Sequence, residues 1–159
     1  MPELEVRPAT IDDAVGVEPL LADALSRLHT LRGGPALLEL LGLPKDVDAA
    51  QLSTALCGDA LLGDALLGTA TLVATLEDAV VGVAVALRSP TGIELVGVHT
   101  ARSLRRRRIG TSLLEEARSL ATASGERFEA LALPGDQTVK SLLEAAGFRA
   151  RLLRMSADR

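Results

Sequence analysis

The chain has 159 residues and a formal net charge of −4 at pH 7, and 48% of its residues are hydrophobic. This length suits one domain with a sizeable core, so we expect residues 1–159 to form a single domain. The apolar content argues against wholesale disorder. No apolar run reaches membrane-spanning length, because charges or glycines interrupt each one, and the acidic segment Met1–Glu5 lacks a signal-peptide pattern.

Rare residue types exclude several kinds of site. Cys57 is the only cysteine, which excludes an internal disulfide and fits a reducing cytosol, so we expect a cytoplasmic protein. Because the chain has neither a C-x-x-C pair nor a histidine cluster, we expect no metal site. Two Phe, no Tyr and no Trp provide too few aromatic faces to stack on single-stranded nucleic acid. We therefore expect no nucleic-acid partner and, without a spanning segment, no membrane partner.

Charge is distributed unevenly along the chain. Residues 1–78 hold 13 Asp and Glu against 4 Lys and Arg, a net charge of −9, whereas residues 79–159 hold 8 against 13, a net charge of +5. A basic half suits an anionic cofactor, and an acidic half could attract a cationic substrate. Chance variation of surface charge is the alternative interpretation.

The first half of the chain predicts one strand followed by helices. Thr10 is a candidate N-cap, with Asp12 and Asp13 in the first helical turn. Residues 58–68 repeat the run Gly-Asp-Ala-Leu-Leu, and we interpret them as an irregular connection that could form part of a substrate pocket. In order, the expected elements are a strand over Leu4–Arg7, a helix from Thr10 to about Leu31, and helices over Ala36–Leu41 and Ala49–Leu56.

The second half predicts strands that later alternate with helices. Glu77-Asp78 is a plausible hairpin turn, and Gly147 closes the last helix. This order predicts a mixed α/β sheet with helices on its faces. The expected strands are Thr71–Thr75, Val80–Leu87, Ile93–His99, Phe128–Leu133 and Phe148–Met155, and the expected helices run from about Arg107 to Ala123 and from Asp136 to Ala146.

The basic turn Arg105–Thr111 is the most informative feature of the chain. It follows the expected strand Ile93–His99 and opens the next expected helix. The first amides of a helix have no internal partner, and the helix dipole favours negative charge there. The turn also carries four arginines, which are Arg105, Arg106, Arg107 and Arg108. It therefore predicts a site for an anion such as a diphosphate, with a solvated basic face or a nucleic-acid contact as the alternatives.

Two motifs carry a family resemblance. Arg105, Arg108 and Gly110 occupy the marked positions of the pattern Q/R-x-x-G-x-G/A, with Arg108 in place of the middle glycine. The run from Asp136 to Phe148 corresponds to the pattern N-x-x-A…Y-x-x-x-G-F and keeps its final Gly147-Phe148. With these motifs the chain resembles the GNAT superfamily of acetyl-CoA-dependent N-acetyltransferases over nearly its whole length.

The resemblance implies a fold and an activity. The fold is a mixed, mostly antiparallel sheet of six to seven strands flanked by four to five helices. The activity is transfer of an acetyl group from acetyl-CoA to a primary amine, on a small molecule or a peptide, by direct attack in a ternary complex. Many members pair as dimers, so we expect a homodimer. The rivals are a non-catalytic acyl-CoA-binding domain and an interaction protein that binds through residues 56–67.

The resemblance also assigns cofactor residues. The pyrophosphate would be held by the backbone amides of Arg106, Arg107, Arg108, Ile109 and Gly110. Because these contacts use the backbone, the Arg108 side chain can point outward. The Thr111 hydroxyl could add a hydrogen bond. Arg105 and Asp136, which begin the two motifs, are also expected to contact the cofactor. The pantetheine arm would pair with the backbone of Val98, His99 and Thr100 like an added strand, and an amide near Val98 could stabilise the thioester oxyanion.

Glu94 is the sharpest catalytic candidate. Its spacing before Arg105 resembles that of the general-base glutamate of histone-type members, and a strand carboxylate could accept an amine proton directly or through water. His99 titrates in a range that suits a base, although a structural role is the alternative. His29 and Arg32 follow the first helix, where they could contact a substrate carboxylate or cap the helix. The tyrosine that protonates the leaving thiolate in many members corresponds to Leu143.

Overall fold

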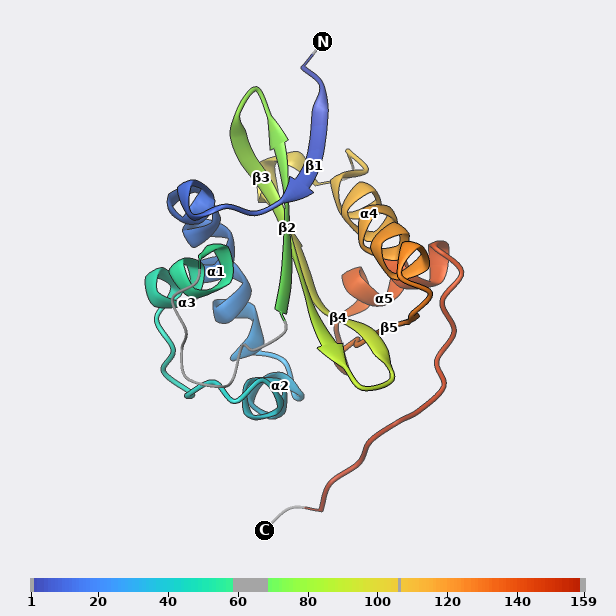
Figure 1. Cartoon of the computed structure of the whole chain (residues 1–159). Helices are drawn as coiled ribbons and strands as arrows, with labels where there is room; N and C mark the ends of the chain where they lie inside the picture. The colour runs from blue at the N-terminus through green and yellow to red at the C-terminus, as the bar shows by residue number, and fades with distance from the viewer. Residues whose placement is uncertain (1, 59–68, 106, 158–159) are drawn as a thin grey trace.

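The computed structural model describes residues 2–58, 69–105 and 107–157, which form one sheet with helices on both faces (Figure 1). The expected irregular connection at residues 58–68 lies, apart from Gly58, outside the described residues. In chain order, the elements are β1 (Leu4–Pro8), the 3-10 helix η1 (Ile11–Asp13), α1 (Ala14–Leu28), α2 (Gly34–Leu40), α3 (Ala49–Cys57), β2 (Thr69–Leu76), β3 (Ala79–Ser89), β4 (Gly92–Thr100), the 3-10 helix η3 (Arg102–Leu104), α4 (Ile109–Ala123), β5 (Arg127–Ala130) and α5 (Gln137–Ala145).

The strands follow their sequence order across the sheet. β1, β2, β3 and β4 pair antiparallel, and β4 and β5 pair parallel. A parallel pair needs a crossover connection, which here contains α4. The predicted mixed, mostly antiparallel sheet is therefore confirmed, with five strands in the described part of the chain instead of six or seven.

Helices lie on both faces of the sheet (Figure 1), and a hydrophobic core fills the space on each side. Val83 on β3 packs in the core beneath α1 and α3, and the next residue, Ala84, packs in the core beneath α4. Side chains alternate between the two faces of a strand, so a strand covered on both faces must be apolar throughout. The run Val80–Leu87 meets this requirement. Gly82 allows the close approach of α4, because a Cβ there would lie 2.8 Å from Cγ2 of Ile109.

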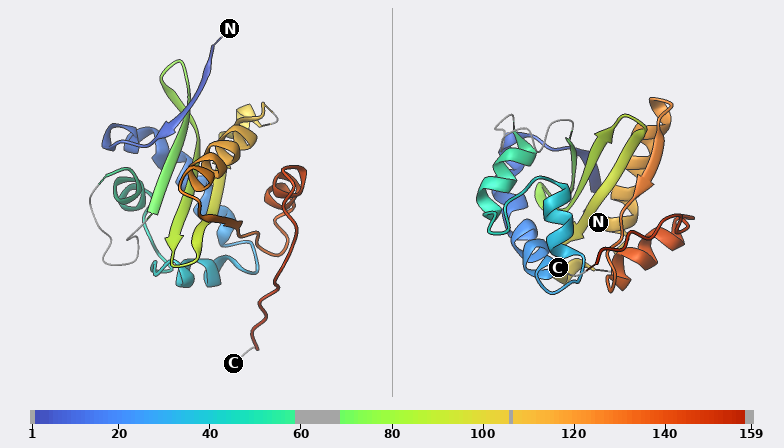
Figure 2. Two further views of the ribbon diagram at one scale, coloured as in Figure 1. Left: turned by 45° about the vertical axis from the view of Figure 1, so that its right-hand side comes forward. Right: turned by 90° about the horizontal axis from the view of Figure 1, so that it is seen from below.

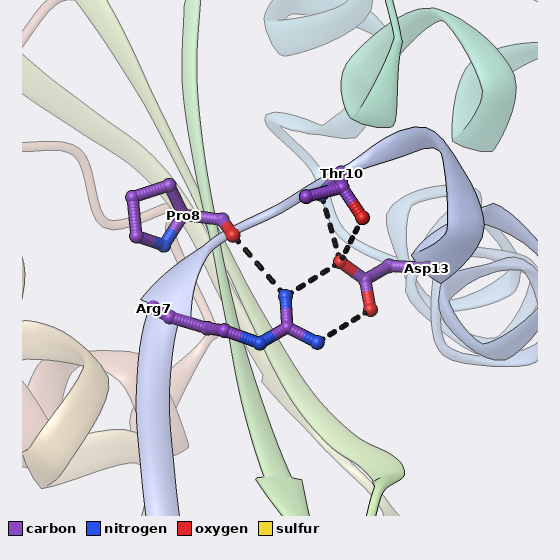
Figure 3. A network of polar contacts seen from close by, with 4 residues as sticks. All are labelled: Arg7, Pro8, Thr10 and Asp13. Carbon is purple, nitrogen blue, oxygen red and sulfur yellow. Dashed lines mark hydrogen bonds and ion pairs between the residues drawn. The ribbon is translucent and has the colours of Figure 1, made fainter.

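An ion pair fixes the corner between β1 and α1 (Figure 3). Nη1 and Nη2 of Arg7 donate to Oδ2 and Oδ1 of Asp13 at 2.8 and 2.9 Å. The backbone N–H of Thr10 also donates to Oδ2 at 2.7 Å. The Asp13 side chain is only 8% exposed, and its hydrogen bond from Arg7 holds the pKa of Asp13 below its usual value. Thr10 is thus the N-cap residue that the sequence predicts.

One predicted element is wrong. The expected strand Phe148–Met155 does not form. Phe148 packs against Phe128 of β5, and the chain from Arg149 to Ala157 runs away from the sheet without regular structure (Figure 2). Arginine alternates with other residues there as in a strand, but a strand also needs a neighbour for its backbone hydrogen bonds. Leu152 and Leu153 remain 84% and 73% exposed.

Several element boundaries also shift by a few residues. β5 ends at Ala130 instead of Leu133, α1 ends at Leu28 instead of near Leu31, and α4 begins at Ile109 instead of Arg107. The chain folds back sharply after α1, where a Cβ at Gly34 would collide with the Leu28 carbonyl. This close approach explains why the helix stops before its apolar pattern does.

Candidate functional site

The sheet opens between β4 and β5. β4 pairs with β5 only from Gly92 to Leu95, whereas its pairing with β3 continues to Thr100. The Leu131 amide donates to the Leu95 carbonyl at 2.9 Å, and no strand of the described residues follows on that side. The end of β4 therefore has an open edge, whose backbone groups can pair with an extended ligand.

A bulge lies where the opening begins. Leu95 faces Ala86 and Gly97 faces Val85, so Val96 is an extra residue on β4. A bulge shifts the alternation of side chains and turns a backbone group out of the ladder. Its consequence here is that Glu94 and His99 lie on the same face of the sheet, although they are five positions apart.

The N-terminus of α4 lies beside this opening. The first helical hydrogen bond runs from the Ser112 amide to the Arg108 carbonyl at 2.9 Å, so the amides before Ser112 have no partner within the helix. A Cβ at Gly110 would lie 3.7 Å from Cγ1 of Val98 on β4 and 3.3 Å from Cδ2 of Leu142 on α5. The open strand edge and the helix amides thus lie side by side, and together they are a candidate site for a ligand with an anionic group. Arg106 lies outside the described residues.

Arg108 adopts a backbone conformation that favours glycine. It is the N-cap of α4, with φ 61° and ψ 16°, in the left-handed region. The side chain is exposed, as expected if only backbone amides contact the ligand. Arg108 therefore adopts the backbone conformation that a glycine could adopt here, and its Cβ adds about 1 kcal/mol of strain.

A polar cluster lies on the other side of β4, against α1. Oδ1 of Asp23 forms an ion pair with Nη2 of Arg102 at 2.7 Å. The other carboxylate oxygen, Oδ2, lies 2.9 Å from Nε2 of His99. That second contact is electrostatic, because the two atoms are close but do not have the geometry of a hydrogen bond. Nη2 of Arg105 lies 3.9 Å from the same oxygen. Nothing in the sequence singles out Asp23, because its partners are 76 or more positions away.

The cluster sets the charge state of its members. Burial lowers the pKa of His99 and outweighs the opposing effect of the Asp23 carboxylate, and the guanidinium groups of Arg105 and Arg27 lower it further. The hydrogen bond from Arg102 lowers the pKa of Asp23. Near pH 7 the cluster therefore holds a neutral imidazole against a carboxylate and two arginines.

Glu94 is half-buried on the same face as His99. It faces Leu87 on β3 and Glu129 on β5. In the described part of the chain the Glu94 carboxylate has no hydrogen bond or ion pair, whereas Glu129 pairs with Nη2 of Arg127 at 2.9 Å. The Glu94 carboxylate thus has no partner among the described residues, two positions before the opening begins at Val96.

The connection between α1 and α2 borders the same region. A Cβ at Gly33 would lie 3.0 Å from Cδ2 of Leu133, so this connection packs on the segment between β5 and α5. His29 and Arg32 lie on it and are exposed. Asp136 caps α5 by accepting the Val139 amide at 3.3 Å.

Asp136 also makes a long-range contact. Its Oδ1 accepts a hydrogen bond from Nη2 of Arg27 at 3.1 Å, and this bond connects α5 to α1. The carboxylate is thus engaged with protein partners on both sides of the opening. Leu143, at the position of the family tyrosine, is 6% exposed and packs in the core beneath α4.

Two further properties concern the described residues alone. They include no group of three His, Cys, Asp or Glu side chains that could hold a metal ion. None of their helices has the length and apolar character needed to cross a membrane.

Comparison with known families identifies the class of this protein. The sequence profile described as the acetyltransferase (GNAT) family matches residues 44–148, which include the bulged strand, the basic turn and α5. The chain belongs to the GNAT acetyltransferase family. Comparison with curated protein sequences found no significant match.

Solved structures show the same fold at low sequence identity. The aminoglycoside N-acetyltransferase AAC(6′)-Iy, in complex with CoA, is 17% identical with a TM-score of 0.69, and the match covers 100% of this chain and 96% of that one. The ribosomal-protein-alanine N-acetyltransferase from Brucella melitensis biovar Abortus 2308 is 15% identical, with a TM-score of 0.64 and coverage of 97% and 100%. The diaminobutyrate acetyltransferase EctA from Paenibacillus lautus, in complex with L-2,4-diaminobutyric acid and CoA, is 22% identical, with a TM-score of 0.61 and coverage of 92% and 75%.

Proposed function

We propose that this protein is an N-acetyltransferase that moves an acetyl group from acetyl-CoA to a primary amine by direct attack within a ternary complex. The observation that carries the proposal is the open edge of β4 beside the partner-free amides of α4. An extended arm that ends in a diphosphate fits this arrangement. CoA is such a molecule, and the similar structures of AAC(6′)-Iy and EctA contain it.

The backbone supplies most of the cofactor site. The amides of Arg107 to Thr111 and of Arg106 would bind the diphosphate, with charge support from Arg105. Backbone groups of Val98, His99 and Thr100 would pair with the pantetheine arm. Acetyl-CoA supplies the acetyl thioester, and a backbone amide near Val98 is our candidate to stabilise the oxyanion.

Glu94 is our candidate for the general base. A half-buried carboxylate without a protein partner can take a proton from an amine, directly or through water. His99 is the second candidate, because its neutral imidazole can also accept a proton. No tyrosine replaces Leu143, so we assign protonation of the leaving thiolate to water.

The acceptor is proposed to be a small-molecule or peptide amine. The Glu94 carboxylate has no partner among the described residues, so its charge favours a cationic group beside it. AAC(6′)-Iy is named for aminoglycosides, and EctA was solved with diaminobutyric acid, so amines of this kind belong in the first screen. His29 and Arg32 are candidates to contact a carboxylate on the acceptor.

The wider setting of the activity is also proposed. We infer one domain over residues 1–159, a cytoplasmic location and a homodimer without nucleic-acid or membrane partners. Sedimentation of the purified protein tests the homodimer.

Calorimetric titration with acetyl-CoA, CoA and a longer acyl-CoA tests the cofactor site. We expect micromolar binding, about −8 kcal/mol, that is lost when Arg105 and Arg107 are both replaced by Glu. Binding followed by turnover in an amine screen supports the enzyme. Binding without turnover of any amine favours the non-catalytic acyl-CoA-binding domain, which the buried Leu143 already suggests. No binding of any of the three contradicts the proposal.

A further inference from the structure

Asp23 lies where the face of β4 that carries Glu94 and His99 meets the basic turn. Its carboxylate contacts His99 at the end of β4, Arg102 in η3 and Arg105 in the turn. We propose that Asp23 is a positioning residue that links the basic turn to His99: an anion bound at the turn draws Arg105 away from Asp23 and leaves that carboxylate oxygen to His99. This inference rests on the proposed CoA site and concerns how its occupancy reaches the amine side.

The two carboxylate oxygens of Asp23 contact different partners. Oδ1 is held by Arg102 at 2.7 Å, and Oδ2 is shared between His99 at 2.9 Å and Arg105 at 3.9 Å. The Arg105 contact is the longest and weakest of the three. The Arg105 side chain is 40% exposed and can turn outward, whereas the His99 side chain is only 9% exposed and cannot.

The position of Arg105 makes the exchange possible. It contacts Asp23 and lies three positions before Arg108, the N-cap of α4, so its side chain is a candidate to contact an anion at the helix amides. A diphosphate offers a guanidinium more charge and more acceptor atoms than one shared carboxylate oxygen. Binding of the anion therefore competes with Asp23 for Arg105.

The charged groups around His99 determine whether its pKa rises or falls when an anion binds. Asp23 and Arg27 face it from α1, and Arg102 and Arg105 face it from the connection after β4. Its β3 neighbour Val83 is uncharged, Arg27 is paired with Asp136, and Glu94 lies on the same strand about 13 Å away.

These groups act on His99 in opposite directions. The Asp23 carboxylate raises the pKa of His99 and the Arg105 charge lowers it. When an anion neutralises Arg105, the lowering effect weakens while the Asp23 effect remains, so the pKa of His99 rises. By linkage, binding of the anion takes up protons, and its affinity falls as pH rises through the titration of His99. His99 thus becomes a better proton acceptor when the cosubstrate is bound.

The test uses 3′-dephospho-CoA, which keeps the diphosphate but lacks the phosphate monoester that titrates near neutral pH. Calorimetry of the full chain in buffers of different ionisation enthalpy measures the protons exchanged on binding. We expect net proton uptake near neutral pH and an affinity about fivefold lower at pH 8 than at pH 6. His99→Gln should bind without proton uptake.

Nuclear magnetic resonance of the histidine rings tests the link without any ligand. The chain has two histidines, so the spectrum of His29→Gln assigns the His99 signal. We expect Asp23→Asn to lower the pKa of His99 and Arg105→Gln to raise it. Arg107→Gln is the matched control from the same turn, and it should leave the pKa of His99 unchanged because Arg107 makes no contact with Asp23.

The outcomes separate this inference from the proposed function. If neither CoA nor 3′-dephospho-CoA binds, both are overturned. Binding without proton uptake, or uptake that persists in His99→Gln, overturns the inference alone. An unchanged pKa of His99 in both Asp23→Asn and Arg105→Gln overturns it as well, whatever the ligand does.

Discussion

At the scale of single residues, Arg108 shows how a departure from a family pattern can be tolerated. Glycine reaches the left-handed conformation without steric cost, whereas an arginine there brings its Cβ close to the backbone. The conformation persists in this chain with φ 61°, because Ile109 and the residues after it anchor α4 in the core. The family pattern thus encodes a backbone conformation, and the side chain at this position serves mainly to permit it.

Replacing Arg108 with glycine separates strain from charge. Arg108→Gly should increase the free energy of unfolding by about 0.5 kcal/mol, because roughly 1 kcal/mol of relieved strain exceeds the entropy that glycine adds to the unfolded chain. Arg108→Ala removes the same charge but keeps the Cβ and should not stabilise the protein. Chemical denaturation of the three proteins measures the difference. Equal stabilisation by both substitutions would mean that charge repulsion among the arginines, and not strain, is relieved.

Glu94 carries the prediction that bears on catalysis. Glu94→Gln should lower kcat about a hundredfold, because the amide keeps the shape but cannot accept the amine proton. The affinity for acetyl-CoA should stay unchanged, since the cofactor site consists of backbone groups and the basic turn. Glu129→Gln is the matched control, because Glu129 is the cross-strand neighbour of Glu94 and already pairs with Arg127. Unchanged turnover in Glu94→Gln would remove Glu94 from the mechanism and leave His99 as the base.

At the scale of elements, the corner between β1 and α1 depends on one buried carboxylate. Asp13→Asn should lower the free energy of unfolding at pH 7 by about 2 kcal/mol, because the charged hydrogen bonds from Arg7 are lost. The folded pKa of Asp13 lies below its usual value of 3.8. Its contribution is therefore present above the unfolded pKa and is lost as pH falls through the folded pKa.

A pH series checks this sign. Urea denaturation should show a constant difference between the wild-type protein and Asp13→Asn above about pH 4 and a shrinking difference below it. Asp12→Asn is the matched control, since Asp12 is the exposed neighbour in the same turn, and it should change the unfolding free energy by no more than about 0.5 kcal/mol. A difference that persists unchanged at the lowest pH would show that shape, and not charge, sets the cost.

Elements with strong local signals could be predicted, and those that depend on distant neighbours could not. The Thr10 cap, the Glu77-Asp78 turn and the Asp136 cap each combine a suitable residue with a local hydrogen-bonding need. The bulge at Val96 has no such signal, because it depends on the register between β3 and β4. Sequence reasoning does not identify Asp23 for the same reason, since Asp23 contacts its partners only when α1 packs on β4.

At the scale of the whole molecule, the uneven charge of the sequence becomes a difference between the two sides of the sheet. The acidic first half builds α1, α2 and α3 on one face, and the basic second half builds α4 and α5 on the other (Figure 1). The opening of β4 lies between them. An anionic cosubstrate at the N-terminus of α4 and a cationic amine near Glu94 would therefore each meet favourable charge.

The segment after Ala150 gives the last prediction. Deletion of residues 152–159 should change the free energy of unfolding by no more than about 0.5 kcal/mol, because every described residue in it is exposed. Leu152 and Met155 are 84% and 83% exposed, so they bury no surface whose loss would destabilise the fold. Denaturation of the shortened and full chains, at several protein concentrations, measures the effect. A loss above about 1.5 kcal/mol would mean that Leu152 and its neighbours bury apolar surface against the folded protein. A loss that grows with protein concentration would place that buried surface between two copies of the chain, because only an association is sensitive to concentration.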